Sequence, residues 1–233
     1  MTTFAAGPHR DADGRFAVLG SVRHFDGAIV SVRVDTVAMP GGGTAQREVV
    51  EHMRAVAVVA LDADGRVVLI EQYRHPLRRR LWEIPAGLMD IGEEAPLAAA
   101  RRELVEEVGL TAENWSVLID VASSPGFCTE AVRVFLATGL TDAPAPDAVD
   151  EEADLRQIRL PLTDAVAAVM RGDIVNGTAV AGLLAASRVL GGGRDVAAVL
   201  RPGDDPWTDS PALVAGPGPV GGAPALTDSG QGR

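Results

Sequence analysis

The chain has 233 residues and a formal net charge of −11, from 21 Lys and Arg against 32 Asp and Glu. This length suits one compact domain with extensions or two small domains, and 47% hydrophobic residues can fill a sizeable core. A protein that neutralises nucleic-acid phosphates needs a basic stripe, whereas the densest basic run here is only Arg78–Arg80. We therefore expect no nucleic-acid partner.

Cysteine use and hydropathy indicate the compartment. Cys128 is the only cysteine, so the chain cannot form an internal disulfide, which favours a reducing compartment. No apolar run is long enough to span a membrane, and residues 1–15 lack the basic-then-apolar order of a secretion signal. We expect a cytoplasmic protein without a membrane partner.

The N-terminal section predicts a small antiparallel β unit. Residues 1–20 are rich in Gly, Ala and charge and are expected to be poorly ordered. Alternating apolar residues within Gly27–Met39 predict a strand. Pro40–Gly43 must turn, and Gln46–Val50 then returns as a second strand.

The following elements alternate irregularly between strand and helix. Two apolar runs, Ala55–Leu61 and Arg66–Tyr73, are joined by the turn sequence Asp62–Gly65 and predict a β-hairpin. Further strands are expected at Trp115–Val121, Ala131–Thr138 and Asp154–Leu160, and helices at Pro96–Val108, Leu162–Arg171 and Thr178–Leu190.

Mixed strands around a central helix, without regular β-α alternation, predict the α+β class. We expect an N-terminal β unit at residues 1–52 and the main domain at residues 53–200. Residues 201–233 are expected to form a largely disordered tail, because Gly, Pro, Asp and Ala offer little to bury.

The predicted helix at Pro96–Val108 carries an unusual set of carboxylates. Its apolar residues fall on one stripe, whereas Glu103, Glu106 and Glu107 gather on a different arc bordered by Arg102. Like charges at this spacing repel one another, and a divalent cation with oxygen ligands removes that repulsion. A solvated acidic helix face is the common alternative. The Gly-containing loop at Ile84–Gly87 favours a metal site, because it lets backbone approach a cation.

This segment resembles the Nudix box, G-x5-E-x7-R-E-U-x-E-E-x-G-U, in which U is a bulky aliphatic residue. From Glu94 the match is complete: seven residues precede Arg102-Glu103-Leu104, and Glu106-Glu107 and Gly109-Leu110 follow at the required spacing. Gly87 and Glu94 enclose six residues instead of five. We interpret the extra residue as a longer loop.

The chain resembles the ADP-ribose pyrophosphatase branch of the family, over about Gly27–Leu190. Pro125, sixteen residues after Gly109, matches a proline characteristic of that branch. Other similar segments are Gln72–Arg74, Leu81–Gly87, Met39–Gly43 with Arg47–Val50, and Glu151–Asp154. The resemblance implies a Nudix α/β/α sandwich with a mixed β-sheet, and a homodimer in which the N-terminal units are exchanged.

The resemblance also implies a metal site. Glu103 and Glu107 are then the principal Mg²⁺ ligands together with the main-chain carbonyl of Ala86, and Mn²⁺ can replace Mg²⁺. Glu106 is a further ligand or holds a metal-bound water. A solvated acidic side chain remains the alternative for Glu106.

A water must also be deprotonated or oriented by a carboxylate outside the helix. The family places this general base in the loop at residues 150–154, where Glu152 matches best and Glu151 is the runner-up. Arg47 and Arg74 match substrate-contacting arginines, with Arg47 reaching the partner subunit's site. Surface arginine is an equal alternative for each. Glu130 is a weaker candidate for binding ribose hydroxyls or supporting the water.

We therefore expect a Mg²⁺-dependent enzyme that hydrolyses ADP-ribose to AMP and ribose 5-phosphate. Other nucleoside diphosphate sugars or dinucleotides are the nearest alternative substrates. A non-catalytic nucleotide-sensing regulator is a further alternative, disfavoured because such proteins usually carry a DNA-binding segment and often a degraded box.

Overall fold

The computed structural model describes residues 14–92, 94–144, 154–192 and 200–207. The chain divides into two compact units, of which the first ends at Glu51 and the second begins at His52.

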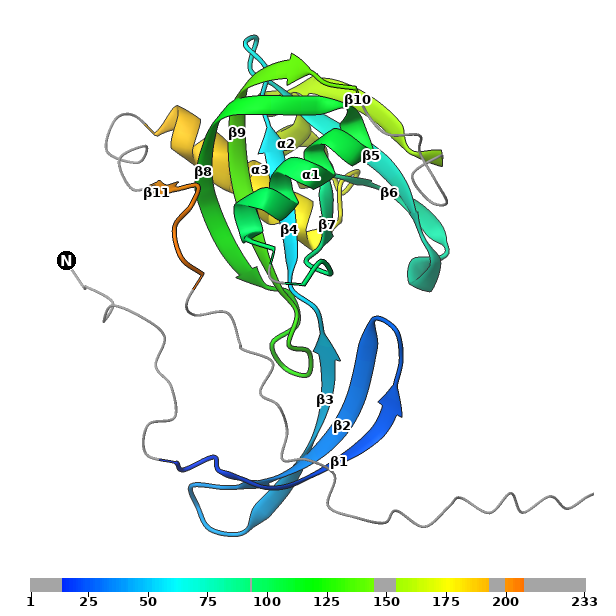
Figure 1. The fold of residues 1–233 in the computed structure, drawn as a ribbon, viewed down its shortest axis with the longest axis vertical. Coiled ribbons are helices and arrows are strands. Elements are labelled where there is room, and N and C mark those ends of the chain that lie inside the picture. The colour runs from blue at the N-terminus through cyan, green and yellow to red at the C-terminus, as the bar shows by residue number, and fades with distance from the viewer. Residues whose placement is uncertain (1–13, 93, 145–153, 193–199, 208–233) are drawn as a thin grey trace, which may run out of the picture. The chain divides into compact units, whose positions relative to one another are not determined.

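The N-terminal unit is a three-stranded sheet in the order β1-β2-β3 (Figure 1). Its strands are β1 (Val18–Asp26), β2 (Val30–Ala38) and β3 (Thr44–His52). The two predicted strands are confirmed as β2 and β3. The expectation of poor order up to residue 20 is wrong from Val18 onward, since β1 pairs with β2 in antiparallel register. Its sequence alternates weakly, and pairing with β2 rather than periodicity makes it a strand.

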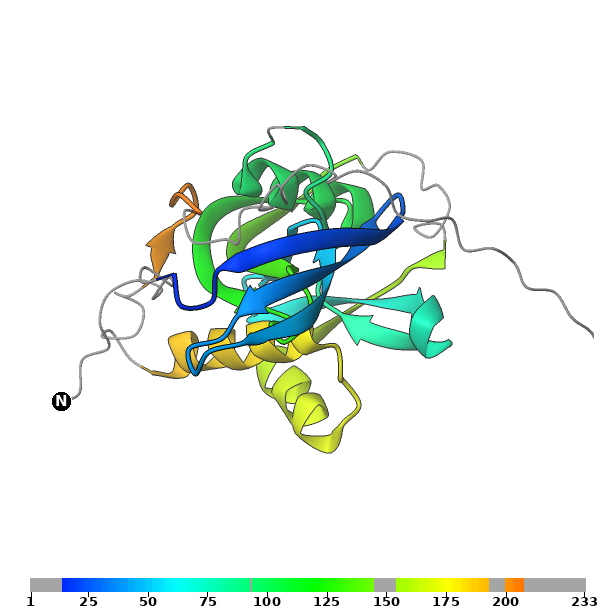
Figure 2. The same ribbon diagram turned by 90° about the horizontal axis from the view of Figure 1, so that it is seen from below.

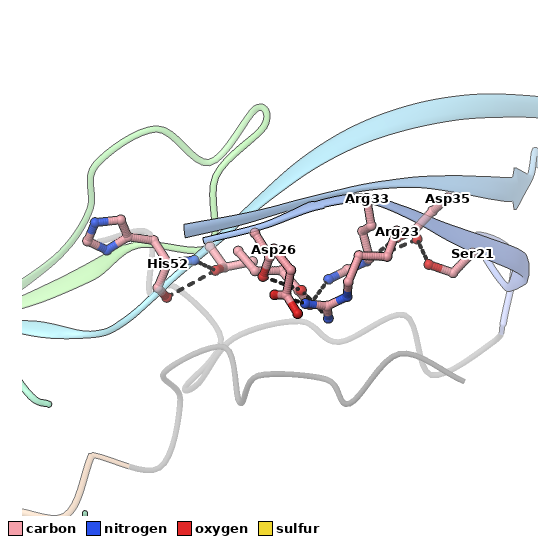
Figure 3. Close-up of polar contacts among 9 residues, drawn as sticks. Ser21, Arg23, Asp26, Arg33, Asp35 and His52 are labelled. Carbon is pink, nitrogen blue, oxygen red and sulfur yellow. Dashed lines mark hydrogen bonds and ion pairs between the residues drawn. The ribbon is translucent and has the colours of Figure 1, made fainter. Parts of the chain in front are cut away.

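Buried charges connect the strands of this unit (Figure 3). Asp35 and Glu51 are only 4% and 7% exposed, and Arg33 binds both carboxylates. Arg23 donates to Glu51 at 2.8 Å, and Ser21 donates to Asp35 at 2.7 Å. Burial opposes the ionisation of Asp35, but the hydrogen bonds from Arg33 and Ser21 hold its pKa below the usual value. Paired buried charges of this kind fix the register of the three strands.

The second unit contains two sheets, one with strand order β11-β8-β9-β4-β7 and one with order β10-β5-β6. In the larger sheet β4 is parallel to β9, whereas β8–β9 and β4–β7 are antiparallel, so the predicted mixed sheet is confirmed. The strands are β4 (Ala55–Ala60), β5 (Arg66–Arg74), β6 (Arg79–Glu83), β7 (Ala86–Leu88), β8 (Leu110–Ala122), β9 (Ala131–Asp142), β10 (Arg156–Pro161) and β11 (Arg201–Pro202).

Helices cover both faces of the larger sheet (Figures 1 and 2). The helix α1 (Pro96–Val108) lies on one face, and α2 (Leu162–Arg171) and α3 (Gly177–Gly191) lie on the other. A short 3-10 turn, η1 (His75–Leu77), separates β5 from β6. The expected α/β/α sandwich is thereby confirmed. Within the described ranges, no helix is both long and apolar enough to cross a membrane.

The central strand β4 supplies both cores, because alternate residues point to opposite faces. Val56 and Val58 pack under α1 with Phe135 and Leu104. Ala57 and Val59 pack toward α2 and α3 with residues such as Leu183. All six residues of β4 are buried, which explains the continuous apolar run in the sequence.

The predicted hairpin at residues 55–73 is wrong in its pairing. The turn forms, since the Gly65 N–H donates to the Asp62 carbonyl at 3.0 Å. Beyond it, β4 and β5 belong to different sheets and share only the single bridge Leu61–Val67. A strand in the interior of a domain needs a hydrogen-bonding partner strand at each edge, because its backbone cannot bind water. For β4 these partners are β7 and β9. Short-range turn signals could not reveal those partners.

Two further features of the second unit differ from the expectation. The strands β6 and β7 lie in a region for which no strand was predicted, and they pair with β5 and β4. The ordered domain also continues past residue 200, since β11 pairs with β8 and the segment is described as far as Trp207. These elements are too short for periodicity to identify, and only their partners stabilise them.

Asn176 caps α3 at its N-terminus, where its side-chain oxygen accepts a hydrogen bond from the Ala179 N–H at 2.9 Å. Asn176→Ala is expected to lower the free energy of unfolding by about 1 kcal/mol, because that amide loses its partner. Asn176→Asp keeps an acceptor and should stay close to the parent. Urea unfolding followed by circular dichroism measures both, and equal losses for the two variants would contradict the capping role.

Candidate active site

The helix α1 places the acidic residues of the site. It begins at Pro96, whose missing N–H is not needed in the first turn, and ends at Val108, followed by the cap residue Gly109 with φ of +62°. The Gly109 N–H donates to the Val105 carbonyl at 2.9 Å. These bounds match the predicted helix. Ala100 and Leu104 of the apolar stripe are fully buried, so the orientation of the acidic arc is fixed.

Glu103 lies against the backbone of β7. It is 8% exposed, and a Cβ on Gly87 would lie 2.0 Å from its Cδ and 2.1–2.3 Å from its carboxylate oxygens. Only glycine at position 87 leaves room for this carboxylate. Burial is the main cause that raises the pKa of Glu103, to about 6, and the nearby carboxylate of Glu106 adds to it.

Glu107 is the second carboxylate of this site. Its Oε2 accepts a hydrogen bond from the Ala86 N–H at 2.8 Å, which ties α1 to the start of β7. Burial raises the pKa of Glu107 to about 8, the Ala86 N–H opposes this shift, and the charge of Glu103 adds to it. Two partly desolvated carboxylates therefore lie next to the Ala86–Gly87 backbone.

Arg102 organises the outer carboxylates. One of its terminal nitrogens, Nη1, donates to Glu103 at 2.6 Å and to Glu106 at 2.8 Å. The other side of the guanidinium binds Glu94 at 3.1 Å and 3.3 Å. Burial disfavours the charge of Arg102, but its hydrogen bonds to Glu94 and Glu106 raise its pKa further above the usual value. Arg102, which borders the acidic arc, therefore holds three carboxylates of the motif together.

The loop before α1 accommodates the additional residue of the motif. The Glu94 N–H donates to the Ile91 carbonyl at 2.9 Å, forming a turn before the helix begins. The Glu94 carboxylate still reaches Arg102 across the loop. The spacing from Glu94 through α1 is therefore intact, and the insertion is confined to the loop.

Arg74, at the end of β5, is held by a residue that the sequence interpretation did not single out. Glu83 is 2% exposed, and its two oxygens accept from Arg74 at 2.8 Å and 2.7 Å. The charge of Arg74 also opposes the rise in the pKa of Glu107, after the larger effects of burial, the Ala86 N–H and Glu103. A charged residue within the otherwise apolar run at 81–85 was the signal that could have revealed Glu83.

The remaining predicted residues have other contacts or lie outside the described residues. Arg47 lies on β3 in the N-terminal unit, and its side chain donates to the Gln46 carbonyl at 2.9 Å. Glu130 lies just before β9, where it accepts from Ser123 and approaches His52 Nδ1 at 3.7 Å. The predicted base Glu152 and its alternative Glu151 lie outside the described residues.

The acidic side chains of α1 are held by other protein groups in this structure. Within residues 14–92, 94–144, 154–192 and 200–207, no three carboxylate, imidazole or thiol groups already converge as a ligand set. Glu103 and Glu106 are turned to Arg102, while Glu107 faces Ala86. The donor set nevertheless fits a hard cation, because Mg²⁺ prefers oxygen ligands and the pKa values of Glu103 and Glu107 stay raised despite the nearby Arg102 and Arg74. The missing Cβ at Gly87 lets the Glu103 carboxylate lie directly against the backbone of β7, which supports the same fit.

The pKa of Glu107 predicts how the metal-free protein responds to pH. Burial raises the pKa of Glu107 from 4.5 to about 8 in the folded protein. Below pH 4.5 the carboxyl is protonated in both the folded and the unfolded state and does not destabilise the fold. From pH 4.5 to about pH 8 the unfolded state ionises first, so the free energy of unfolding decreases. Without divalent cations, the melting temperature should therefore fall between pH 6 and pH 8 by several degrees, at ~2–4 °C per kcal/mol. Added Mg²⁺ should restore more stability at pH 8 than at pH 6. Calorimetric melting of Glu107→Gln, which should lack this dependence, provides the control.

Comparison with known proteins agrees with this geometry. The NUDIX domain family matches residues 51–178. The chain is 48% identical over 204 residues to an ADP-ribose pyrophosphatase of Mycobacterium tuberculosis, an alignment that covers 88% of this chain and 97% of that protein. It is 39% identical over 142 residues to an ADP-ribose pyrophosphatase of Bacillus subtilis, covering 61% and 76% respectively.

A solved structure shows the same fold. The crystal structure of an ADP compounds hydrolase superposes with a TM-score of 0.67 at 23% identity, covering 77% of this chain and 97% of that one. The domain match, the coverage of the relatives and the box geometry on α1 agree. This chain belongs to the Nudix hydrolase family.

Proposed function

We propose that this protein hydrolyses ADP-ribose to AMP and ribose 5-phosphate in a reaction that depends on Mg²⁺. The main support is the pair of desolvated carboxylates, Glu103 and Glu107, held against the Ala86–Gly87 backbone. The relatives named ADP-ribose pyrophosphatase support the substrate. In the reaction, water adds to one phosphorus while the bridging P–O bond breaks, and the bridging oxygen leaves with the other phosphate.

The residues that would hold the cation are Glu103, Glu107 and the Ala86 carbonyl, with Glu106 as a further ligand or as the holder of a water. Bound Mg²⁺, or Mn²⁺ in its place, would supply charge neutralisation of the pyrophosphate and a lower pKa for a nearby water. Arg102 keeps Glu103 and Glu106 in place before the cation binds. We propose that the side chains then exchange part of their contact with Arg102 for the metal.

We propose Glu152 as the group that deprotonates or orients the attacking water, with Glu151 as the alternative. This proposal rests on the acidic sequence of residues 150–154 and its similarity to the family. Glu152→Gln should lower kcat while Mg²⁺ binding, measured by calorimetry, persists. An unchanged kcat would transfer the role to Glu151, for which Glu151→Gln is the matching variant.

Arg74, Arg47 and Glu130 are proposed substrate contacts. Arg74 has the strongest support, because Glu83 orients its guanidinium and its charge acts on Glu107. A planar guanidinium suits a phosphate oxygen or a stacked base. Arg47 would act in the partner subunit's site, and Glu130 would accept ribose hydroxyls.

We also propose a cytoplasmic homodimer with exchanged N-terminal units. The support is an apolar surface on β1, where Val18, Leu19, Val22 and Phe25 are 52–62% exposed. Side chains of this kind usually mark an interface when they gather on one strand. Light scattering after gel filtration should give the mass of a dimer, and Leu19→Lys with Phe25→Lys should shift it toward a monomer.

One assay tests the proposed substrate. The purified protein is incubated with Mg²⁺ and, separately, with ADP-ribose, other nucleoside diphosphate sugars and dinucleotides, and the products are separated by chromatography. The proposal requires AMP and ribose 5-phosphate from ADP-ribose at the highest kcat/KM of the set. Preference for another compound would reassign the substrate, and nucleotide binding without any product would indicate a sensing protein.

A further inference from the structure

The segment at residues 200–207, here called the C-terminal strap, is attached to the edge of the larger sheet. Its strand β11 pairs with Val117 and Ser116 of β8. Arg201 donates to Asp120 at 2.8 Å and to Asp205 at 3.2 Å. Paired backbone and two charged contacts therefore hold the strap along β8.

Arg133 of β9 provides the anchor beneath the end of the strap. Its side chain is 1% exposed and binds Asp120 through Nε at 2.8 Å and Nη2 at 3.1 Å. Its Nη1 donates to the Asp205 carbonyl at 2.5 Å, and its guanidinium carbon lies 4.9 Å from the Trp207 ring centroid. Because Arg133 is buried and bound on several sides, it fixes the position of the Trp207 ring.

A second guanidinium, that of Arg54, also contacts this ring. The guanidinium carbon of Arg54 lies 5.5 Å from the Trp207 centroid, within the range of a cation–π interaction. Unlike Arg133, Arg54 is exposed. Among the described residues, the Trp207 ring is the contact found for the Arg54 side chain, and no described carboxylate binds Arg54.

The sheet register places Arg54 on the face that carries the acidic site. Val56 lies opposite Gly87, and the Arg54 carbonyl accepts from the Met89 N–H at 2.9 Å. Side chains alternate along extended backbone, so Arg54, which directly precedes β4, points to the same face as Val56, toward α1. Because Val56 lies opposite Gly87, the backbone of Arg54 is displaced from Gly87 by only two residues along the strand direction, about 7 Å at the usual rise. A Cβ on Gly87 would point at the Glu103 carboxylate.

We propose that Arg54 contacts a phosphate oxygen of the substrate and that Trp207 is a positioning residue that holds the Arg54 guanidinium for this contact. A cation–π contact with a ring face needs no hydrogen bond from the guanidinium, whose five N–H donors stay available for an anion. An acidic site that binds a pyrophosphate needs cations close to it. This inference rests on the proposed hydrolysis of a nucleotide-linked pyrophosphate.

The alternative is that Arg54 serves only to anchor the strap. The two roles differ in what a variant changes. A phosphate contact affects substrate affinity, whereas an anchor affects stability and leaves KM close to that of the parent. Arg101 offers a matched control, because it is another exposed arginine whose guanidinium carbon lies over a tryptophan, 5.9 Å from the Trp115 ring centroid.

The experiment measures KM and kcat with ADP-ribose for Arg54→Gln, Trp207→Leu, Trp207→Phe, the double variant Arg54→Gln/Trp207→Leu, and Arg101→Gln. Arg54→Gln should raise KM on the order of 10-fold or more, the value of a charged hydrogen bond, with kcat within about 3-fold. Trp207→Leu should raise KM about 2- to 5-fold, and Trp207→Phe should retain most of the affinity. Arg101→Gln should leave KM unchanged.

The double variant and a binding measurement complete the test. If Trp207 acts through Arg54, the double variant has the KM of Arg54→Gln alone, whereas additive effects would overturn the positioning role. Calorimetric binding of inorganic pyrophosphate with Mg²⁺ should weaken in Arg54→Gln and not in Arg101→Gln. If another sugar nucleotide proves to be the substrate, the same variants are compared on it. Parent-like KM and pyrophosphate affinity in Arg54→Gln would overturn the inference, whichever substrate is turned over.

Discussion

Glu107→Gln is expected to lower kcat for ADP-ribose hydrolysis by ~10²- to 10⁴-fold at saturating Mg²⁺. A metal ligand supports several kcal/mol of transition-state stabilisation, and each 1.36 kcal/mol corresponds to tenfold in rate. The amide oxygen of Gln can still accept the hydrogen bond from the Ala86 N–H, which lies 2.8 Å from Glu107 Oε2 in the parent. The variant should therefore fold normally and lose chemistry rather than structure.

The stability of Glu107→Gln separates this explanation from simple damage to the site. Because the parent carboxylate is desolvated and its pKa is raised to about 8, the neutral variant should be at least as stable as the metal-free parent at pH 8. Glu113→Gln, an exposed carboxylate on β8, is the control and should keep full activity. Steady-state kinetics together with thermal melting decide the matter. Near-parent turnover by Glu107→Gln would remove Glu107 from the metal site.

Gly87→Ala is the second variant with a large expected effect. The new methyl group would lie 2.0–2.3 Å from the Glu103 carboxylate atoms, so the carboxylate must move. Its end is flexible, and the cost in stability should stay within ~1–3 kcal/mol. A displacement of about 1 Å at a reacting site can still reduce the rate ~10²-fold. We therefore expect a large loss of kcat and weaker Mg²⁺ binding in a folded protein.

Two comparisons show whether the effect passes through Glu103. Gly177→Ala adds the same methyl group where no atom lies within 4 Å, and it should leave kinetics unchanged. In a Glu103→Ala background the steric conflict is absent, so adding Gly87→Ala should cost no further stability. Denaturant unfolding and calorimetric Mg²⁺ titration measure these effects. Full activity in Gly87→Ala would show that Glu103 has another position from which it can act.

The acidic helix shows how far the sequence leads. Pro96, the apolar stripe and Gly109 determine where α1 begins, which side it buries and where it ends, because each acts through local backbone or periodic burial. The same spacing determines the order of Arg102, Glu103 and Glu107 on the other side. The Nudix family, the mixed sheet and the helices α2 and α3 were accordingly predictable from the sequence.

Long-range contacts decided the rest. The apolar runs of β4 and β5 predict strands, but not that the two strands enter different sheets, since pairing depends on partners such as β9 far along the chain. Likewise, no local pattern indicates that Glu83 binds Arg74. Nor does any local pattern indicate that Trp207 contacts Arg54, about 150 residues earlier in the chain. The sequence by itself determined the family and the candidate ligands on α1. Only the tertiary structure decided how Ala86 and Gly87 meet those carboxylates, because that contact exists only once β7 has paired with β4.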